Sequence, residues 1–330
     1  MKQCTIYKLF LCSMHVIEHL TKAKGTLLSY EVLPPLKGKT IKSLFDHIDP
    51  LMEFKPSWIN VTYHRSETIA RTKEDGSTEM VDVRKRPGTV GICAAIMNHY
   101  NVDAIPHIIC GGFSKRETED ALIDLQFLGI DNVLVLRGDA EKGQKTFVPT
   151  PNGNKQAIDL LKQIVGLNNG AYLDKDILNG SKTNFCMGVS GYPEKHFEAP
   201  SMEFDLQKAK EKVDAGAQYI MTQMFFDNKK YFEYVDACRS IGINVPIIPG
   251  LKPITNKKQL TVLPNIFFVD IPEALSKAMN AATTDEACEQ VGTEWLIQQS
   301  KELKAAGVPV LHYYTLGKPK VIRDVGAKVI

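Results

Sequence analysis

Residues 132–139 read NVLVLRGD, in which an almost wholly apolar stretch is followed by an arginine, a glycine and an aspartate. Seven further short apolar runs also end in polar or charged residues, and segments of helical character separate most of them. Strands that are apolar on nearly every residue are typical of parallel sheets buried on both faces. The pattern therefore predicts an α/β fold, a (β/α)8 TIM barrel with extra helices, whose functional site lies at the carboxyl ends of the strands.

The predicted elements follow these runs along the chain. We expect strands at 27–33, 58–63, 103–110, 131–137, 185–190, 218–225, 245–249 and 308–316. We expect helices at 40–54, 89–100, 114–127, 155–166, 203–215, 229–241, 256–262, 271–281 and 284–306. Residues 65–88 carry mixed charge, and we interpret them as a long loop of the kind that often has a function.

Residues at helix ends support these boundaries. An S-x-x-E pattern that begins at Ser114 is typical of a capping box at a helix start. Gly216 and Gly242 stand where a glycine commonly ends a helix. Asp227 or Asn228 is expected to cap the helix that follows the sixth strand.

Length and composition limit the class of protein. A (β/α)8 barrel takes about 250 residues. In this 330-residue chain we therefore expect residues 25–330 to form a single barrel and residues 1–24 an N-terminal extension with a helix. The net charge of +2 indicates neither a nucleic-acid nor a membrane partner. Seven scattered cysteines without a C-x-x-C pair or zinc-like spacing indicate a reducing, cytoplasmic setting and no metal site.

The first residues loosely resemble a signal peptide, but Lys8 interrupts their apolar part and no small-residue cleavage site follows. Residues 1–13 are either a dispensable extension or an artefact of the start site. No uncharged apolar stretch approaches the roughly 18–20 residues of a membrane span.

Several nucleotide-binding and hydrolytic motifs are missing from the sequence. G-x-G occurs nowhere, so a Rossmann fingerprint is excluded. The nearest approach to a phosphate-binding loop runs from Gly138 to Gly143 and continues with Gln144 rather than lysine. The zinc-protease motif H-E-x-x-H and the hydrolase motif G-x-S-x-G are also absent.

Polar residues inside or just after the strands are the first candidate site residues. Glu31 lies in an apolar strand, so it is either a buried salt-bridge partner or a general acid with a raised pKa. His107 is either a satisfied core histidine or a ligand-binding residue. Arg137 and Asp139 either form a structural ion pair or serve a ligand that Gly138 lets approach the backbone closely.

Two further motifs follow later strands. The GYPEKH motif offers Tyr192, Lys195 and His196, although Gly-Tyr-Pro also suits an ordinary turn. The TQMFFD motif places Gln223 near a strand end, where its amide needs a hydrogen-bond partner. All these candidates fall at equivalent positions of successive strand–helix units, so we expect them to converge on one mouth of the barrel.

The chain resembles the methylenetetrahydrofolate reductase family over about residues 25–318. The motifs that carry the resemblance are, in order, YEVLPP, VTY, PHIIC, LRGD, GYPEKH, KVDAGAQYIMTQMFFD, IIPGLKPIT and LHYYTL. The resemblance implies a flavin-dependent barrel of the bacterial type, catalytic domain only. Such an enzyme reduces methylenetetrahydrofolate to methyltetrahydrofolate and supplies methyl groups for methionine synthesis. The C-terminal regulatory domain of animal-type members has no counterpart here, so no inhibition by S-adenosylmethionine is expected.

The resemblance also implies roles for individual residues. Glu31 is the expected general acid, which protonates the folate nitrogen that leaves when the five-membered ring opens. Asp139 is expected between flavin and pterin, where it favours the cationic iminium that accepts the hydride. Gln223 is expected to bind the pterin, and Lys318 the glutamate tail of the folate. The positions expected to contact FAD are Thr62, His107, Arg137, Gly138, Asp139, Tyr192, His196, Asp205 and Lys212.

Three positions depart from the family pattern. Gln156 stands where a tyrosine often stacks on the flavin, and Lys257 where some members have a phenylalanine that shields nicotinamide or folate. Glu211 stands where a basic residue is expected near the adenine. The resemblance therefore does not predict the affinity for the cofactor or the choice of reductant.

The family's reaction implies a ping-pong cycle in which NADH reduces bound FAD and leaves before the folate takes its place. NADPH or another electron donor stays open, as does the number of subunits, although family members tend to form homo-oligomers. Two other classes remain. A barrel enzyme of different chemistry would show no folate-dependent reoxidation, and a non-catalytic barrel kept for binding or assembly would hold no tightly bound flavin.

Overall fold

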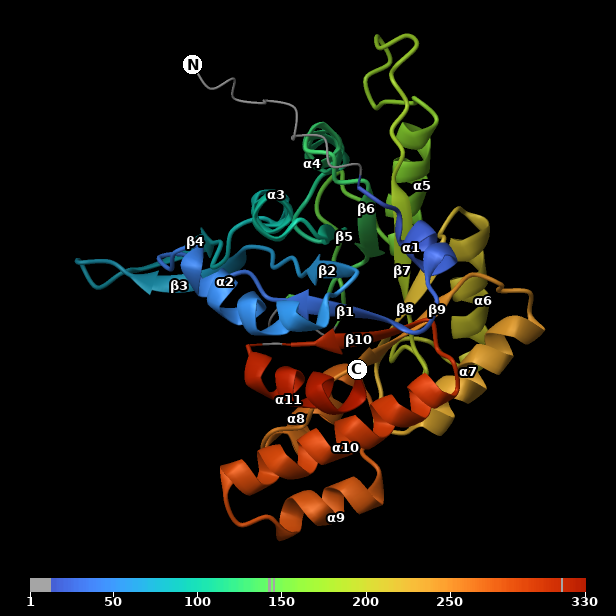
Figure 1. Cartoon of the computed structure of the whole chain (residues 1–330). Helices are drawn as coiled ribbons and strands as arrows, with labels where there is room; N and C mark the ends of the chain where they lie inside the picture. The colour runs from blue at the N-terminus through green and yellow to red at the C-terminus, as the bar shows by residue number, and fades with distance from the viewer. Residues whose placement is uncertain (1–12, 142–143, 145, 316) are drawn as a thin grey trace, which may run out of the picture.

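Eight parallel strands close into a barrel in the computed structural model, which describes residues 13–141, 144, 146–315 and 317–330 (Figure 1). The strand order around the barrel is β1-β10-β9-β8-β7-β6-β5-β2. The strands are β1 (Leu27–Val32), β2 (Trp58–Val61), β5 (Asp103–Ile109), β6 (Asn132–Leu136), β7 (Cys186–Gly191), β8 (Tyr219–Met224), β9 (Ile247–Leu251) and β10 (Val310–Tyr314). The predicted TIM barrel is confirmed, with each strand within a few residues of its expected position.

Helices surround the strands and confirm most predicted segments. They are α1 (Val16–Lys22), α2 (Lys42–Ile48), α3 (Thr89–Tyr100), α4 (Lys115–Phe127), α5 (Ala157–Asn168), α6 (Met202–Asp214), α7 (Asn228–Ser240), α8 (Gln259–Phe267), α9 (Glu273–Ala281), α10 (Asp285–Ala305) and α11 (Pro319–Val329). Ser114 forms the expected capping box at α4. Asp227, rather than Asn228, caps α7 by accepting the amide of Lys229. Gly216 and Gly242 have positive φ angles just past their helices, as predicted.

Three segments differ from the prediction. The helix expected at 40–54 is α2 followed by a 3-10 helix, η1 (Asp49–Phe54), with Pro50 at its start. Residues 65–88 are not a plain loop, because they contain an antiparallel hairpin of β3 (Glu67–Thr72) and β4 (Thr78–Val83). This hairpin projects to one side of the barrel in Figure 1. Helix α11, after the last strand, was not anticipated from the sequence. Residues 1–12, which include most of the proposed N-terminal extension, lie outside the described residues, as do 142–143, 145 and 316.

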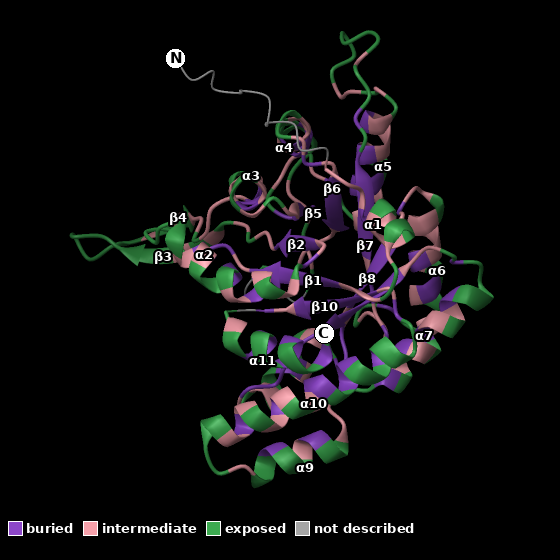
Figure 2. Cartoon of the chain, viewed as in Figure 1, coloured by how far each residue is buried: buried purple, intermediate pink, exposed green. Residues whose placement is uncertain are grey.

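Two apolar layers hold the barrel together. Side chains between the strands and the surrounding helices form the larger core, and a smaller cluster that includes Trp58 and Tyr219 fills the barrel interior. Figure 2 shows the strands buried and the outer helix faces exposed. Burial at about 25 cal/mol per Å² of apolar surface is the main stabilising contribution in such a fold.

Helix α1 closes the amino-terminal end of the barrel. Val16 belongs to the interior cluster, and its backbone amide donates to Asn132 Oδ1 at 2.9 Å. His19 Nε2 lies 2.6 Å from Asp103 Oδ2, at the start of β5. The carboxyl ends of the strands are therefore the end at which a ligand can enter.

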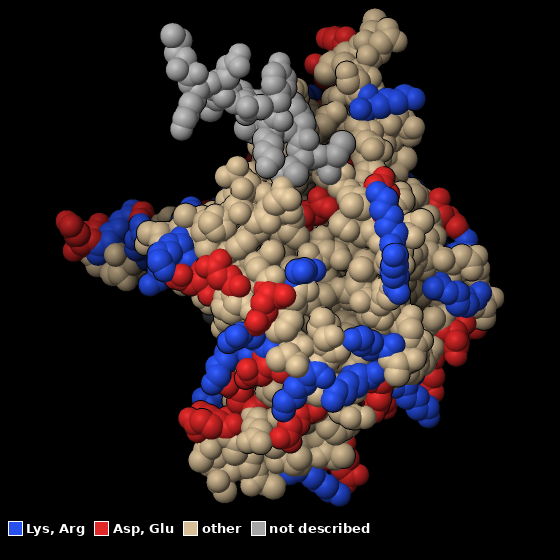
Figure 3. All heavy atoms as spheres, in the orientation of Figure 1, with Lys and Arg blue, Asp and Glu red and all other residues tan. Residues whose placement is uncertain are grey.

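Acidic and basic side chains are interspersed over the face shown in Figure 3. That distribution agrees with the small net charge. Across the described part of the chain, no helix has both the length and the apolar character needed to cross a membrane.

Candidate active site

A cavity of about 1270 Å³ opens at the carboxyl ends of the strands. Almost all the candidate residues line this cavity. They are Glu31, Thr62, His107, Arg137, Gly138, Asp139, Tyr192, His196, Asp205, Lys212 and Gln223. Lys318 stands apart from this wall at the start of α11, where its Nζ lies 3.1 Å from Glu289 on α10. The expected convergence on one mouth is thus observed for these residues. It is not observed for Lys318 or for Lys195, whose ammonium donates to the carbonyls of His196 and Ala199.

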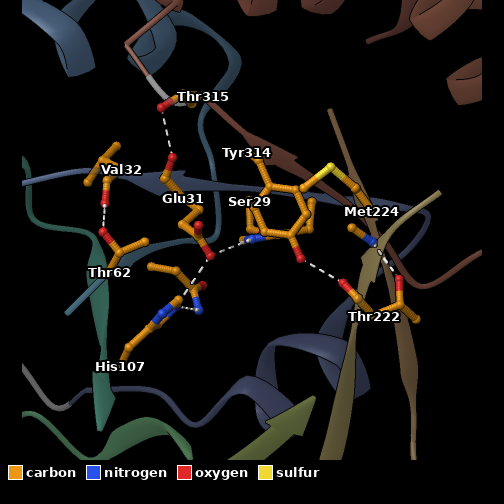
Figure 4. A network of polar contacts seen from close by, with 12 residues as sticks. Ser29, Glu31, Val32, Thr62, His107, Thr222, Met224, Tyr314 and Thr315 are labelled. Atoms are coloured by element: carbon orange, nitrogen blue, oxygen red, sulfur yellow. Dashed lines mark hydrogen bonds and ion pairs between the residues drawn. The ribbon is translucent and has the colours of Figure 1, made fainter. Parts of the chain in front are cut away.

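The Glu31 carboxyl group is the most deeply buried acidic group in this wall. Glu31 is only 7% exposed, and its Oε2 lies 3.3 Å from His107 Nε2 and 4.0 Å from His312 Nε2 (Figure 4). Its backbone carbonyl accepts both the amide and the hydroxyl of Thr315, at 3.1 and 2.7 Å. These contacts tie β1 to the end of β10 and fix the position of the acid.

Burial controls the protonation of this group. It raises the pKa of Glu31, and the nearby His107 only partly opposes that rise. Burial also lowers the pKa of His107, against the opposing effect of Glu31, and lowers the pKa of His312 to about 3. Because the charged form of each group is disfavoured, the cluster tends towards a neutral carboxyl group beside two neutral imidazoles.

His312 was not singled out in the sequence, although it lies in the LHYYTL motif. It is fully buried, and its Nδ1 is 2.8 Å from Ser29 Oγ. Asn60 Nδ2 lies 3.5 Å from His107 Nε2 on the other side of the acid. The signal that could have found His312 is its spacing of two residues from Tyr314, because alternate residues of a strand share one face.

Tyr314 and Gln223 form the adjacent part of the wall. The Tyr314 hydroxyl donates to the Thr222 carbonyl at 2.6 Å and can cross β9 only because Gly250 has no side chain (Figure 4). The register between β8 and β9 shifts between Met221 and Met224. Such irregularities often redirect a side chain next to a functional site. Here the Gln223 side chain lines the cavity, with its oxygen accepting the Met224 amide at 2.9 Å.

The LRGD segment, at the end of β6, lies across the barrel from β10 and Tyr314. Arg137 forms an ion pair with Glu198 and lies over the Phe147 ring, 5.2 Å from its centroid. The structural Arg137–Asp139 pair considered from the sequence is therefore not what holds the arginine. Gly138 adopts a φ of +85°, which turns the chain so that Asp139 stays exposed in the cavity wall.

A separate end of the cavity is built from the GYPEKH loop and α6. The Tyr192 and His196 rings meet edge to face at 4.7 Å, and the His196 amide donates to Asp205 Oδ2 at 3.0 Å. Lys212 donates to the Ser190 carbonyl at 2.8 Å. Burial lowers the pKa of Lys212 to about 8, although Asp205 opposes the shift. This end offers ring surfaces, a carboxylate and a partly buried ammonium group, which suit the ring, hydroxyl and phosphate groups of a nucleotide.

The three residues that depart from the family pattern are placed as follows. Gln156 precedes the first turn of α5 and lines the cavity. Glu211 also lines the cavity, and its carboxylate is held 2.8 Å from Lys208. Lys257 does not line this cavity. Its ammonium donates to the Asn280 carbonyl at 2.9 Å, and the residue borders a smaller pocket of about 410 Å³.

Comparisons with known proteins identify the family of the chain. A family model described as methylenetetrahydrofolate reductase matches residues 16–329. The chain is 32% identical over 314 residues to "Methylenetetrahydrofolate reductase (NADH) 1" of Arabidopsis thaliana, covering 92% of this chain and 48% of that protein. It thus spans about half the length of this plant relative. It is 29% identical over 311 residues to "5,10-methylenetetrahydrofolate reductase" of Salmonella typhimurium, covering 92% of this chain and 91% of that protein.

Among solved structures, one similar protein is an uncharacterized protein from Clostridium thermocellum, described as binding two copies of 5-methyl-5,6,7,8-tetrahydrofolic acid. Its TM-score is 0.56 at 13% identity, and the alignment covers 94% of this chain and 97% of that one. At this level of identity the likeness shows the shared fold alone.

Proposed function

The chain belongs to the methylenetetrahydrofolate reductase family, and we propose that it reduces methylenetetrahydrofolate to methyltetrahydrofolate with bound FAD and a reduced nicotinamide nucleotide, NADH being the expected donor. The observation that carries this proposal is the buried, neutral-leaning Glu31 carboxyl in a cavity wall shared with Gln223 and Asp139. The resemblance assigns these three residues to the folate. Their common wall supports the assignment.

The cavity wall suits a flavin dinucleotide. Gly138 lines the wall beside Asp139, and Lys212 offers a partly buried ammonium group at the α6 end, where Tyr192 and Asp205 also line the wall. We propose that these residues, with Thr62, His107, Arg137 and His196, hold FAD. Once bound, the flavin would carry a hydride from the nicotinamide to the folate.

Glu31 would supply the proton for ring opening. In the protonated form that burial favours, it can donate to the folate nitrogen as the bond between that nitrogen and the methylene carbon breaks. The exposed Asp139 carboxylate would stabilise the positive charge that develops on the folate when this bond opens. Gln223 would hold the pterin by its amide. Residues 25–330 would act together as one catalytic barrel, and a homo-oligomer is the expected assembly.

The test is an absorbance experiment on the purified protein under anaerobic conditions. We expect a flavin spectrum that bleaches on addition of NADH and returns on addition of methylenetetrahydrofolate. If only dithionite bleaches the flavin but the folate reoxidises it, the reductase activity would be supported and the electron donor would be a compound other than NADH. A colourless protein that takes up no added FAD would refute the proposal.

A further inference from the structure

The hairpin of β3 and β4 contributes a part of the cavity wall to which the proposed function assigns no ligand. Residues of both strands line the cavity, among them Thr68, Ala70 and Met80. The α6 end, which is assigned to FAD, follows β7, and β5 and β6 separate β7 from β2, the strand that leads into the hairpin. The wall of Glu31 and Gln223 is assigned to the folate. The hairpin therefore adjoins a part of the cavity that is open to a further ligand.

One face of the hairpin is exposed and partly apolar. Ala70 pairs with Met80 across the two strands, and Thr68, two residues before Ala70, lies on the same face. All three residues are exposed and line the cavity, and the exposed fraction of Met80 is 67%. A methionine side chain adapts to irregular apolar surfaces, and its sulfur makes favourable contacts with aromatic rings. This face therefore suits a planar ring of a ligand.

Polar contacts fix the base of the hairpin. Lys85 Nζ lies 2.6 Å from Glu67 Oε2, and the Lys85 carbonyl accepts the Lys37 amide at 2.8 Å. The Thr68 hydroxyl donates to Asp82 Oδ1 at 2.6 Å, which joins the two strands near this base. The turn at the other end projects away from the barrel (Figure 1). The contacts at the base therefore set the position of the exposed face beside the cavity.

Arg65, two residues before β3, supplies a cation at the base of the hairpin. Its side chain is 15% exposed and lines the cavity. It packs against Gly111, where a Cβ would lie 3.2 Å from its Nη1. The same Nη1 lies 3.5 Å from Glu141 Oε1, and within the described residues its Nη2 is buried without a hydrogen-bond partner. Its charge is therefore weakly compensated, and an anion in the cavity would lower the cost of its burial.

We propose that the hairpin and Arg65 bind the adenylate half of the reduced nicotinamide nucleotide, with the adenine ring on Met80 and a phosphate beside Arg65. This inference rests on the proposed function and names the part of the cavity that its electron donor occupies. The donor and the folate must reach the same flavin in turn, so the second nucleotide of the donor needs a place outside the folate wall. An exposed apolar face next to a weakly compensated cation matches a ring joined to a phosphate.

The test compares donors that differ in this half. Anaerobic stopped-flow reduction of the FAD-containing protein gives the dissociation constant of each donor and the limiting rate of flavin reduction. NADH should bind at least about tenfold more tightly than reduced nicotinamide mononucleotide, which lacks the adenylate, because charge-assisted hydrogen bonds contribute on that scale. Arg65→Met should lose about tenfold of this preference and leave the affinity for the mononucleotide unchanged. Arg65→Lys, which keeps the charge, should retain part of the preference.

Arg71→Met is the matched control, because Arg71 is an exposed residue of β3 that does not line the cavity. It should leave every affinity unchanged. Met80→Ser gives a second measurement that does not depend on the packing of Arg65, and it should weaken NADH binding by about two- to tenfold. NADPH distinguishes the possible phosphates. Equal losses for NADH and NADPH in Arg65→Met would place the phosphate bridge beside Arg65, and a larger loss for NADPH would place the 2′-phosphate there.

Three results would overturn the proposal. They are equal affinities of the wild-type protein for NADH and the mononucleotide, an unchanged NADH affinity in either Arg65→Met or Met80→Ser, and a loss of FAD or 5-methyltetrahydrofolate affinity in place of donor affinity. A wild-type flavin that the folate reoxidises but that neither NADH nor NADPH bleaches would also overturn it, and the reductase activity would still stand. A protein that takes up no FAD would instead refute the proposed function itself.

Discussion

Replacement of Glu31 by glutamine should separate the two half-reactions. Glutamine preserves the size of the side chain but cannot give up a proton. A positioned general acid is typically worth about 10²–10⁴ in rate, which is about 3–5 kcal/mol of transition-state stabilisation. Glu31 is only 7% exposed, and the neutral-leaning His107, 3.3 Å away, is a poor proton donor in its place. Folate reduction should therefore slow by that factor, while NADH oxidation by the bound flavin should remain, because it needs no proton from Glu31.

The same variant should change how stability depends on pH. Burial raises the pKa of Glu31 above its unfolded value of about 4.3. A raised pKa means that the stabilising contribution is fully present below the unfolded value and is lost as the pH rises through the folded value. Glu31→Gln has no such loss. The melting temperature of the variant minus that of the wild type should therefore increase as the pH rises above the unfolded value.

Stopped-flow absorbance of the flavin and thermal melts across this pH range measure the two effects. Glu119→Gln is the matched control, because Glu119 is also buried, at 9% exposed, but lies on α4, outside the cavity wall, where it accepts the Leu173 amide at 2.8 Å. It should leave folate reduction unchanged. Normal folate reduction by Glu31→Gln would remove Glu31 from the acid role. A difference in melting temperature that is constant with pH would show that burial does not control its ionisation.

Three further changes test other parts of the structure. Gly292→Ala should lower the free energy of unfolding by about 1–3 kcal/mol or more in a urea titration, because its Cβ would lie 1.6 Å from the Ile254 carbonyl oxygen and α10 would have to move. Lys212→Met should weaken FAD binding by about tenfold or more, measured by flavin fluorescence, and unchanged affinity would exclude its ammonium from the cofactor site. His19→Ala should lower the free energy of unfolding by about 1–3 kcal/mol, because its contact with Asp103 is lost. It should leave folate affinity unchanged, because α1 closes the opposite end of the barrel. A folate affinity that falls with the stability would show that the two ends are coupled.

The barrel could be predicted from the sequence because its strands have an unusual composition. Strands that are buried on both faces are apolar at nearly every position, and their ends are marked by the first polar residue, as at Arg137 after β6. The hairpin of β3 and β4 was missed because its strands are largely exposed and charged. Its signal was present in the alternation on either side of Asp75-Gly76, since an Asp-Gly turn between alternating residues favours a hairpin.

The remaining features depend on pairs of residues that are far apart in the sequence. A strand pattern places Glu31 along β1, but only closure of the barrel between β1 and β10 brings it beside Tyr314 and within 4.0 Å of His312. Burial in the folded barrel raises the pKa of Glu31, as the apolar strand around it suggested, but the two histidines beside it could not be read from the YEVLPP motif. Lys252, the residue directly after β9, is a second example. In the sequence Lys252 is one of 40 lysine and arginine residues, whereas in the fold it is only 7% exposed, and burial together with the charge of Lys318 lowers its pKa to about 8. Motifs therefore identify which residues reach the mouth of a barrel, whereas the pairing of neighbouring strands decides which side chains meet there.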